Sequence, residues 1–444
     1  MITDVQKHLP NPSDIRPIIS RHLLADGFKL VLDMEKSQGL HLHDAATGKD
    51  YIDFFTFFAS NPLGMNHPKL RNDEGFIERL LDAAINKVSN SDVYTPHFAR
   101  FVETFERVGI PDELPHAFFI SGGALAVENA LKTAFDWKVR KNFQKGYRTE
   151  RGHQVMHFEQ AFHGRSGYTM SLTNTDPTKV ALFPKFDWPR ILNPKMNGPE
   201  DAHDIEQREK LAIRQAKMHF HQNPDDIACI ILEPIQGEGG DNHFRPEFLQ
   251  QLRDLADENE ALLIFDEVQT GVGLTGTFWA YQGLGVTPDV LAFGKKAQVC
   301  GILAGTRIEE VHDNVFEKSS RINSTWGGNI VDMVRFDRIL EVIEEDNLVE
   351  NAATVGKHLQ DRLRGIADHY EAVTHPRGQG MMCAFDLTTT AIRNLVRQRC
   401  YERGLIILAC GERTLRFRPA LTLSTDDIDE GLALLEHALA DVLG

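Results

Sequence analysis

The sequence predicts an α/β protein in which helices wrap a mostly parallel sheet. Between about residues 75 and 310, short apolar runs alternate with helical stretches, a pattern typical of parallel sheets covered on both faces. The apolar runs are His116–Ile120, Val155–Phe158, Ile227–Leu232, Ala261–Phe265 and Val290–Phe293. Between the third and the fourth, Pro246–Ala256 places apolar residues three and four positions apart, which predicts an amphipathic helix lying on the sheet.

The pattern changes after about residue 330, where a smaller α+β domain is expected. A long helical stretch begins at Val331 and is followed by short strand patterns near Gly380–Phe385, Leu405–Leu408 and Thr414–Phe417. At the other end, Leu40–His43 and Tyr51–Phe55 predict short strands within an irregular lead-in. We therefore expect three parts: an N-terminal segment over residues 1–70, a large domain over 71–330 and a small C-terminal domain over 331–444.

Composition excludes several classes of protein. The 444 residues carry 64 acidic and 48 basic side chains, and a net charge of −16 argues against nucleic-acid binding. No apolar run approaches the roughly 18 residues of a membrane span, and the first residues, Met1–Gln6, lack the basic and apolar regions of a secretory signal. The five cysteines are scattered, so we expect free thiols in a reducing cytoplasm and no metal site.

The first candidate site is the segment Phe118–Val127. A strand is expected to end at Ile120, Gly122 and Gly123 make a turn, and a helix begins near Ala124. Because glycine has no Cβ and a helix N-terminus carries partial positive charge, an anion such as phosphate could approach the backbone N–H groups. A tight strand-to-helix turn without a ligand is the alternative.

Two further segments place charged side chains at the carboxyl ends of apolar strands, where ligands of open α/β sheets bind. Asp266 and Glu267 follow Ala261–Phe265, and the alternatives for Asp266 are a metal ligand or a structural ion pair. Lys295 follows Val290–Phe293 by two residues; a desolvated lysine there would be a nucleophilic amine. Lys296 is expected to point to solvent, and two surface lysines are the alternative for the pair.

Together these segments fit pyridoxal 5'-phosphate. This cofactor needs an anion cradle for its phosphate, a lysine that forms a Schiff base and a carboxylate facing the ring nitrogen. Phe162 could stack on the ring. The 19 histidines, including His41, His43 and His163, are expected at the surface, in the core or behind the residues that line the site. Their spacing in the sequence is not that of metal ligands.

The chain resembles the class III, fold type I, pyridoxal-phosphate-dependent aminotransferases. The resemblance rests on several motifs, which occur in the right order over some 300 residues. They are Ala161–Arg165, Glu233–Gly240, Asp266–Gly271, Phe293–Lys295, Asn323–Gly328 and Leu415–Pro419. It implies a large domain with a mostly parallel seven-stranded sheet, a smaller α+β C-terminal domain and a homodimer with shared active sites. One departure is Ala297–Gly301, where many members carry a glycine-rich run, so the shape of this loop is open.

The resemblance also implies roles for the cofactor-binding residues. Lys295 would be the Schiff-base lysine and proton shuttle, and Asp266 would face the ring nitrogen. Gly123 and Ala124 would hold the phosphate through their backbone, and Phe162 would stack on the ring. The remaining two are Gln269, near the ring hydroxyl, and Thr325, which would reach the phosphate of the neighbouring subunit.

Arg165 and Arg416 are each suited to a bidentate grip on a carboxylate of the substrate. The acceptor 2-oxoglutarate has two carboxylates and could use both arginines, whereas lysine that reacts at its terminal amine has no carboxylate near the reacting carbon. The resemblance makes Glu238 the movable partner that neutralises Arg416 in that half-reaction. Asn323 would hold the distal end of lysine, and Gln269 would border the substrate.

Within the family, the whole chain is most similar to the lysine 6-aminotransferases. The expected reaction transfers the terminal amino group of L-lysine to 2-oxoglutarate, giving 2-aminoadipate 6-semialdehyde and glutamate by a ping-pong mechanism. A 4-aminobutyrate or ornithine aminotransferase uses the same parts and is the nearest alternative. A catalytically silent pyridoxal-phosphate-binding regulatory protein is the alternative from another class, and a metal-dependent hydrolase is a distant third.

Overall fold

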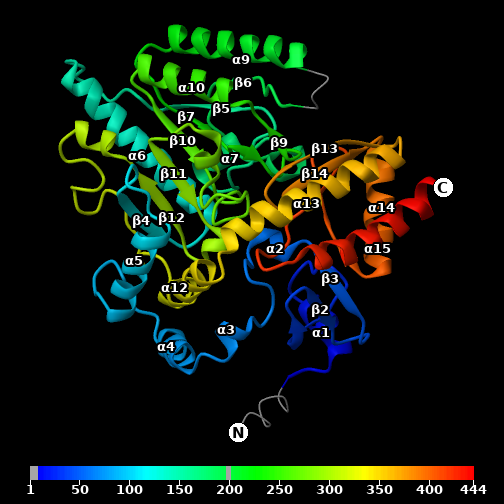
Figure 1. Cartoon of the computed structure of the whole chain (residues 1–444). Helices are drawn as coiled ribbons and strands as arrows, with labels where there is room; N and C mark the ends of the chain where they lie inside the picture. Colours follow the sequence, from blue (N-terminus) through cyan, green and yellow to red (C-terminus); the bar gives the residue numbers. More distant parts are fainter. Residues whose placement is uncertain (1–8, 197–201) are drawn as a thin grey trace.

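The computed structural model describes residues 9–196 and 202–444 (Figure 1). The expectation that Met1–Gln6 carry no secretory signal therefore lies outside the described residues. Fifteen α-helices occur within the described residues. They are α1 Pro12–Ile19, α2 Thr56–Ala59, α3 Pro68–Arg71, α4 Glu74–Ile85, α5 Pro96–Val108, α6 Gly123–Gln144, α7 Gly167–Leu172, α8 Pro177–Val180, α9 Ala202–Gln222, α10 Pro246–Glu258, α11 Ala280–Leu284, α12 Ile330–Glu345, α13 Leu348–His369, α14 Thr390–Arg403 and α15 Thr425–Leu443.

A seven-stranded sheet forms the centre of the molecule, in the order β4-β12-β11-β10-β7-β5-β6. Its strands are β4 His116–Ile120, β5 Gln154–Phe158, β6 Arg190–Ile191, β7 Ile227–Leu232, β10 Leu262–Asp266, β11 Val290–Phe293 and β12 Cys300–Ala304. Only β12 runs antiparallel to its neighbours, and the other six strands point the same way. The predicted α/β class with a mostly parallel seven-stranded sheet is confirmed.

Helices cover both faces of this sheet, which explains why its central strands are apolar throughout. Every residue of β7 and β10 is buried. Ile230 and Leu263 belong to the cluster that contains Phe248 of α10, whereas Ile231 and Ile264 belong to the cluster that contains residues of α6. Successive side chains of a strand alternate between faces, so a sheet buried on both sides needs apolar residues at every position.

The two ends of the chain meet in a second, smaller sheet. Strands β1 Leu32–Gln38, β2 His41–Asp44 and β3 Asp50–Asp53 form an antiparallel meander, and β15 Leu405–Ile406 pairs with β3 in parallel. Figure 1 shows this contact where the blue N-terminal part meets the orange and red C-terminal part. The C-terminal part has an antiparallel sheet of its own, formed by β13 Val373–Gln379, β14 Met382–Leu387, β17 Thr414–Phe417 and β16 Leu408–Cys410.

Five of the seven central strands coincide with the apolar runs in the sequence, and β6 and β12 do not. Strand β6 has two residues, too few to show a pattern. Strand β12 begins at Cys300, inside the segment Ala297–Gly301 whose shape the sequence left open. All five residues of β12 are buried. The strand nevertheless could not be recognised in the sequence, because it follows Lys295 and Lys296 closely and no turn residue marks where it begins.

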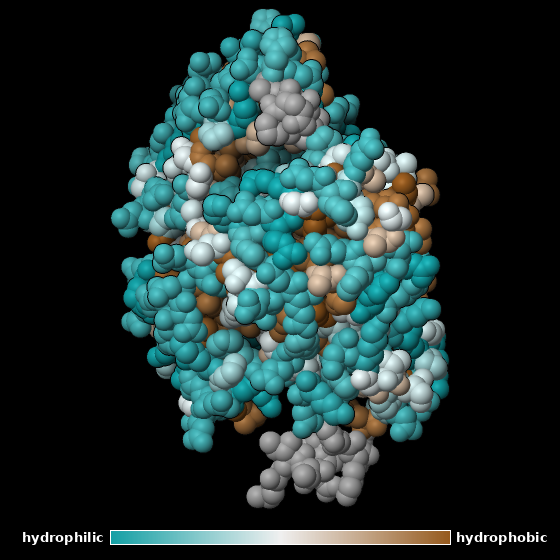
Figure 2. Space-filling model, turned by 45° about the vertical axis from the view of Figure 1, so that its right-hand side comes forward, coloured by the Kyte–Doolittle hydropathy of each residue, from teal (hydrophilic) through white to brown (hydrophobic). Residues whose placement is uncertain are grey.

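The surface is mixed. Hydrophilic residues dominate the face shown in Figure 2, with apolar patches between them. The exposed large apolar side chains include Ile85, Val93, Tyr94, Leu182 and Phe183. Within the described ranges, no helix combines the length and the apolar character needed to cross a membrane.

The approach of α13 to the β13–β14 hairpin yields a stability prediction. A Cβ added to Gly356 in α13 would lie 2.1 Å from the carbonyl carbon of Gly380, whereas a Cβ added to Gly365 on the same helix meets nothing within 4 Å. Gly356→Ala should therefore destabilise the protein by about 1–3 kcal/mol through overpacking. Gly365→Ala should stabilise it by up to about 1 kcal/mol, because alanine favours helix. Thermal unfolding of both variants measures the difference; equal shifts would contradict the close approach.

Candidate active site

A cavity of about 310 Å³ lies where the parallel strands of the central sheet end. Five strands each contribute a residue at or just beyond their carboxyl ends: Gly123 after β4, Phe162 after β5, Glu233 after β7, Asp266 at the end of β10 and Lys295 after β11. The cavity is lined by Gly123, Ala124, Phe162, His163, Gly164, Arg165, Glu233, Asp266, Val268, Gln269 and Lys295. Seven of the predicted site residues therefore meet in one cavity.

One wall of the cavity is the N-terminus of α6, a helix of 22 residues that follows β4. Gly122 precedes it with a φ of 107°, a conformation that glycine adopts without steric cost. A Cβ at Gly123 would lie 2.9 Å from Cγ1 of Val268, which also lines the cavity, so a side chain here would force Val268 to shift. The first N–H groups of a helix have no partner within the helix and attract anions. This wall can hold a phosphate group.

Asp266 lies at the floor of the cavity with 5% of its surface exposed. Its Oδ2 lies 2.8 Å from Nδ1 of His163, and its Oδ1 accepts a hydrogen bond from the backbone N–H of Val268 at 3.1 Å. Among the described residues, Nε2 of His163 has no hydrogen-bond partner although it is buried. The sequence analysis placed His163 among histidines expected at the surface, in the core or behind the site and gave it no specific role; its place next to Phe162 in the Ala161–Arg165 motif was the available signal.

Two buried carboxyl groups brace this region. Glu233 accepts hydrogen bonds from the backbone N–H groups of Phe162 and Gly237, both at 2.9 Å, and so ties the loop after β5 to the loop after β8 Ile235–Gln236. Burial raises the pKa of Glu233 to about 7. Glu267 points away from the cavity and accepts from the backbone N–H groups of Ala280 and Tyr281, at 2.7 and 2.9 Å.

Lys295 and Lys296 have different surroundings. Lys295 lines the cavity; burial lowers the pKa of its amine to about 8, and the charges of Arg416 and Arg418 act in the same direction. A larger fraction of this amine is therefore uncharged and nucleophilic near neutral pH than for an ordinary lysine. The geometry selects Lys295 over Lys296 as the lysine that faces the cavity.

The expectation that Lys296 points to solvent is wrong. Its side chain is 2% exposed, and its Nζ donates to the carbonyl oxygen of Gln269 at 2.8 Å and to that of Ala59 at 3.4 Å. After Gly294 the chain enters a 3-10 turn, Lys295–Ala297, which directs the second lysine between the core and α2. Burial lowers the pKa of Lys296 well below its ordinary value, with a further contribution from the charge of Lys295.

Arg416 reaches the site from β17 and is 1% exposed. Its Nη2 donates to Oε2 of Glu238 at 2.7 Å. Burial raises the pKa of Glu238, but the charges of Arg416 and Lys179 outweigh it and hold that pKa below its ordinary value. The sequence motifs identified both members of this pair, and the structure brings them together.

A second arginine of β17's motif, Arg418, was not singled out in the sequence. It forms a fully buried ion pair with Asp241 and also donates to Oε1 of Gln269, from Nε at 2.9 Å and from Nη2 at 2.8 Å. With its oxygen held by Arg418, the amide nitrogen of Gln269 is the atom left to face the cavity.

Four predicted residues are not part of the lining of this cavity: Glu238, Arg416, Asn323 and Thr325. Arg165 lines the cavity but is exposed, with no ion pair among the described residues. Asn323 and Thr325 are exposed and lie outside the lining. The Oγ of Ser89 donates to the carbonyl oxygen of Thr325 at 2.5 Å, which fixes that loop against the segment after α4.

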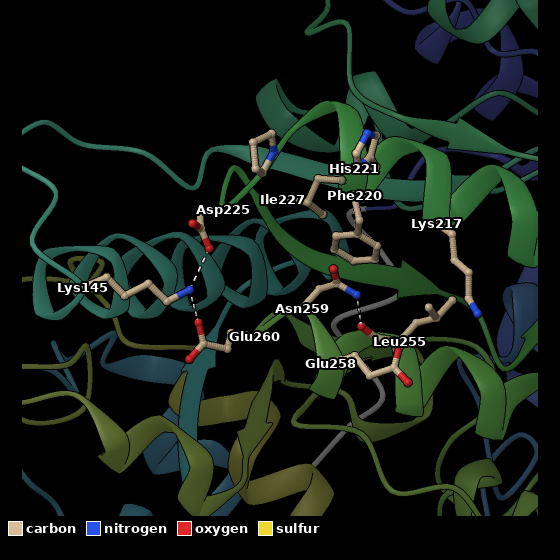
Figure 3. Close-up of a pocket in the computed structure, with 11 residues that line it drawn as sticks. Lys145, Lys217, Phe220, His221, Asp225, Ile227, Leu255, Glu258, Asn259 and Glu260 are labelled. Atoms are coloured by element: carbon tan, nitrogen blue, oxygen red, sulfur yellow. Dashed lines mark hydrogen bonds and ion pairs between the residues drawn. The ribbon is translucent and has the colours of Figure 1, made fainter.

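A larger cavity, of about 550 Å³, lies at the opposite end of the sheet, where β7 begins (Figure 3). Three of its charged groups are paired with one another: Lys145 forms ion pairs with Asp225, at 2.7 Å, and with Glu260. The cavity beside Lys295 instead combines an open helix N-terminus, a buried carboxylate and an amine of lowered pKa. These are the features of a reactive site, so the smaller cavity is the candidate active site.

Comparison with known proteins gives consistent matches. The model of the aminotransferase class-III family matches residues 25–439. The L-lysine-epsilon aminotransferase of Mycobacterium tuberculosis is 56% identical over 429 residues, which cover 96% of both chains. The enzyme of that name from Amycolatopsis lactamdurans is 53% identical and covers 97% of this chain and 96% of its own. A probable mitochondrial 4-aminobutyrate aminotransferase of Caenorhabditis elegans is 32% identical, and the match covers 92% of this chain and 87% of its own.

A solved structure shows the same fold. The lysine aminotransferase of M. tuberculosis in the internal aldimine form superposes with a TM-score of 0.96 and 56% identity, covering 98% of this chain and 100% of that one. The predicted fold type is therefore confirmed.

The burial of Lys296 predicts a specific dependence of stability on pH. The pKa of Lys296 is lower in the folded protein than in the unfolded protein, where it is about 10.5. Between these two pKa values the unfolded protein carries a proton on Lys296 and the folded protein does not. This group's contribution to stability therefore increases as pH rises toward 10.5. Lys296→Met removes that contribution. As pH rises from 8 to 10, the free energy of unfolding of wild type should therefore increase relative to that of the variant. Denaturant unfolding at several pH values measures it; a parallel pH dependence would mean that Lys296 is solvated.

Proposed function

The chain belongs to the class III aminotransferases, and we propose that it transfers the terminal amino group of L-lysine to 2-oxoglutarate. The products are 2-aminoadipate 6-semialdehyde and L-glutamate. As a member of this family it is a pyridoxal-phosphate-dependent enzyme. The observation that carries the choice of lysine is the 51–56% identity, over nearly the whole chain, to enzymes named L-lysine-epsilon aminotransferases, against 32% to a 4-aminobutyrate aminotransferase.

The residues of the cavity fit pyridoxal phosphate. Gly123 and Ala124 would hold its phosphate at the N-terminus of α6, where a Cβ at position 123 would crowd Val268. Phe162 would cover the ring, Asp266 would face the ring nitrogen, and Gln269 would donate from its free amide nitrogen to the ring hydroxyl. When bound, the cofactor supplies an aldehyde that takes up the amino group and a ring that withdraws electrons from the reacting carbon.

The protein side chains would then govern the proton and the charges. Lys295, with an amine of lowered pKa in the cavity, would remove the proton from the carbon that carries the amino group and return it to the cofactor carbon on the other side of that nitrogen. Asp266, hydrogen-bonded to His163, would keep the ring nitrogen protonated. His163 would orient the Asp266 carboxylate through its Nδ1, while Nε2 of the same imidazole has no hydrogen-bond partner among the described residues.

The two half-reactions would use the arginines differently. With lysine bound, Glu238 stays on Arg416, because no carboxylate lies near the reacting carbon. With 2-oxoglutarate bound, the pair opens and Arg416 takes the α-carboxylate, while Arg165 at the mouth takes the distal one. Asn323 would hold the distal end of lysine.

We further propose a homodimer in the cytoplasm, with the three-part division at residues 70 and 330. Exposed apolar side chains at Val93, Tyr94 and Leu182 support an interface. Thr325, exposed on the same chain's surface, would reach the phosphate of the neighbouring subunit. All five cysteines are buried free thiols, as a reducing compartment allows.

A panel of amine donors tests the proposed reaction. With 2-oxoglutarate as acceptor, kcat/KM for L-lysine should exceed that for ornithine and for 4-aminobutyrate, and mass spectrometry should find the 6-semialdehyde of 2-aminoadipate. A higher kcat/KM for ornithine or 4-aminobutyrate would assign the chain to the alternative donor. Absence of amine uptake from all three would favour the non-catalytic alternative.

Replacement of Asp266 by Asn tests the role of the carboxylate. The substitution keeps the size and removes the charge; loss of a charged partner in a shielded site is worth about 3–5 kcal/mol. Turnover should therefore fall at least about a hundredfold, at about 1.4 kcal/mol per tenfold change in rate. Single-turnover rates with lysine measure the effect, and a rate like that of wild type would exclude this role for Asp266.

A further inference from the structure

Glu238 has a second cationic partner besides Arg416. The Nζ of Lys179 lies 2.5 Å from Oε1 of Glu238, while Oε2 of the same carboxylate accepts from Arg416. The side chains of Lys179 and Glu238 are 23% and 28% exposed, so the pair is partly shielded from water. Lys179 belongs to α8, Arg416 to β17 and Glu238 to the loop after β8 Ile235–Gln236, so three separate segments meet at one carboxylate.

Lys179 is held close to the site by its surroundings. Helix α8 is capped by Asp176, which accepts from the backbone N–H of Thr178 at 2.9 Å. The Nζ of Lys179 also lies 5.4 Å from the centre of the Phe162 ring, within the range of a cation–π interaction. The amine therefore sits between the cavity wall and the carboxylate of Glu238.

We propose that Lys179 determines how readily the enzyme accepts a dicarboxylate, by holding Glu238 whenever Arg416 releases it. In the arrangement seen here, two cations share one carboxylate and repel each other. Once a ligand carboxylate occupies Arg416, that repulsion is relieved, and Glu238 keeps a full partner in Lys179. Opening the Glu238–Arg416 pair thus costs less free energy with Lys179 than without it.

Without Lys179, Glu238 and Arg416 form a simple one-to-one pair, and a dicarboxylate has to displace Glu238 into water. The lysine half-reaction keeps the pair closed and does not depend on this difference. Lys179 is therefore a specificity-determining residue for the acceptor and not a catalytic residue. This inference rests on the proposed function in one respect, namely that Arg416 takes a carboxylate of a dicarboxylic substrate.

Binding of glutarate to the holoenzyme tests the inference without turnover. Glutarate has the carbon chain and both carboxylates of 2-oxoglutarate but no oxo group. In Lys179→Met its Kd, measured by calorimetry, should rise about three- to tenfold, as expected for loss of one partly shielded ion pair. Lys179→Arg, which keeps charge and reach, should restore the affinity. Hexanoate, a monocarboxylate with the chain length of lysine, should bind both variants like wild type.

Two controls separate this route from a general loss of positive charge. Lys185→Met removes a nearby exposed lysine whose amine, among the described residues, donates to the carbonyl oxygens of Val180 and Phe183, and glutarate affinity should not change. In a Glu238→Ala background, Lys179→Met should have no further effect, because Lys179 acts through Glu238. An undiminished effect in that background would overturn the inference and mean that Lys179 attracts the ligand directly.

Half-reaction kinetics give the second readout. KM for 2-oxoglutarate should rise in Lys179→Met by the same factor as the Kd of glutarate, with kcat for the lysine half unchanged. An unchanged glutarate Kd in Lys179→Met, with normal binding by wild type, would contradict this inference alone. Failure of the wild-type holoenzyme to bind glutarate, or to react with lysine, would instead contradict the proposed function.

Discussion

The site depends on the common direction of the strands in the central sheet. Because β4, β5, β7, β10 and β11 all point the same way, their carboxyl ends meet along one edge. A helix N-terminus, an aromatic ring, two carboxylates and a lysine, which are far apart in the sequence, become neighbours for that reason. The antiparallel strand β12 returns the chain between β11 and β4 without adding a residue to the cavity lining.

A second constraint is that four cationic side chains are buried close together, and three of them have compensating groups. Arg416 has Glu238 and Arg418 has Asp241, while Lys296 has only backbone carbonyl oxygens. Lys295 has no ion pair among the described residues and carries the lowered pKa that its chemistry requires. The pairing of its neighbours thus leaves this amine free to react.

The residues that line the cavity could be located from the sequence more readily than the residues that hold them in place. Residues that face a ligand follow apolar strands directly, so Asp266 and Lys295 could be located from the run before them. Arg418, Asp241 and Lys179 act through partners many residues away, and no local pattern marks such a contact. Lys296 was misplaced because neighbouring residues of a strand alternate in direction, whereas here the chain has already turned into a 3-10 helix. Strand β12 was missed because its apolar residues follow that turn without a separating signal.

The pairing of β15 with β3 has a consequence for the order in which the protein can fold during synthesis. The backbone N–H of Ile52 donates to the carbonyl oxygen of Gly404, and that of Phe54 to Ile406, so the first meander is completed by residues near the end of the chain. At ribosomal rates of about 5–20 residues per second, this partner emerges on the order of tens of seconds later. Until then the edge of β3 stays open, and the nascent chain presents an unpaired strand that a chaperone or a neighbouring chain could bind.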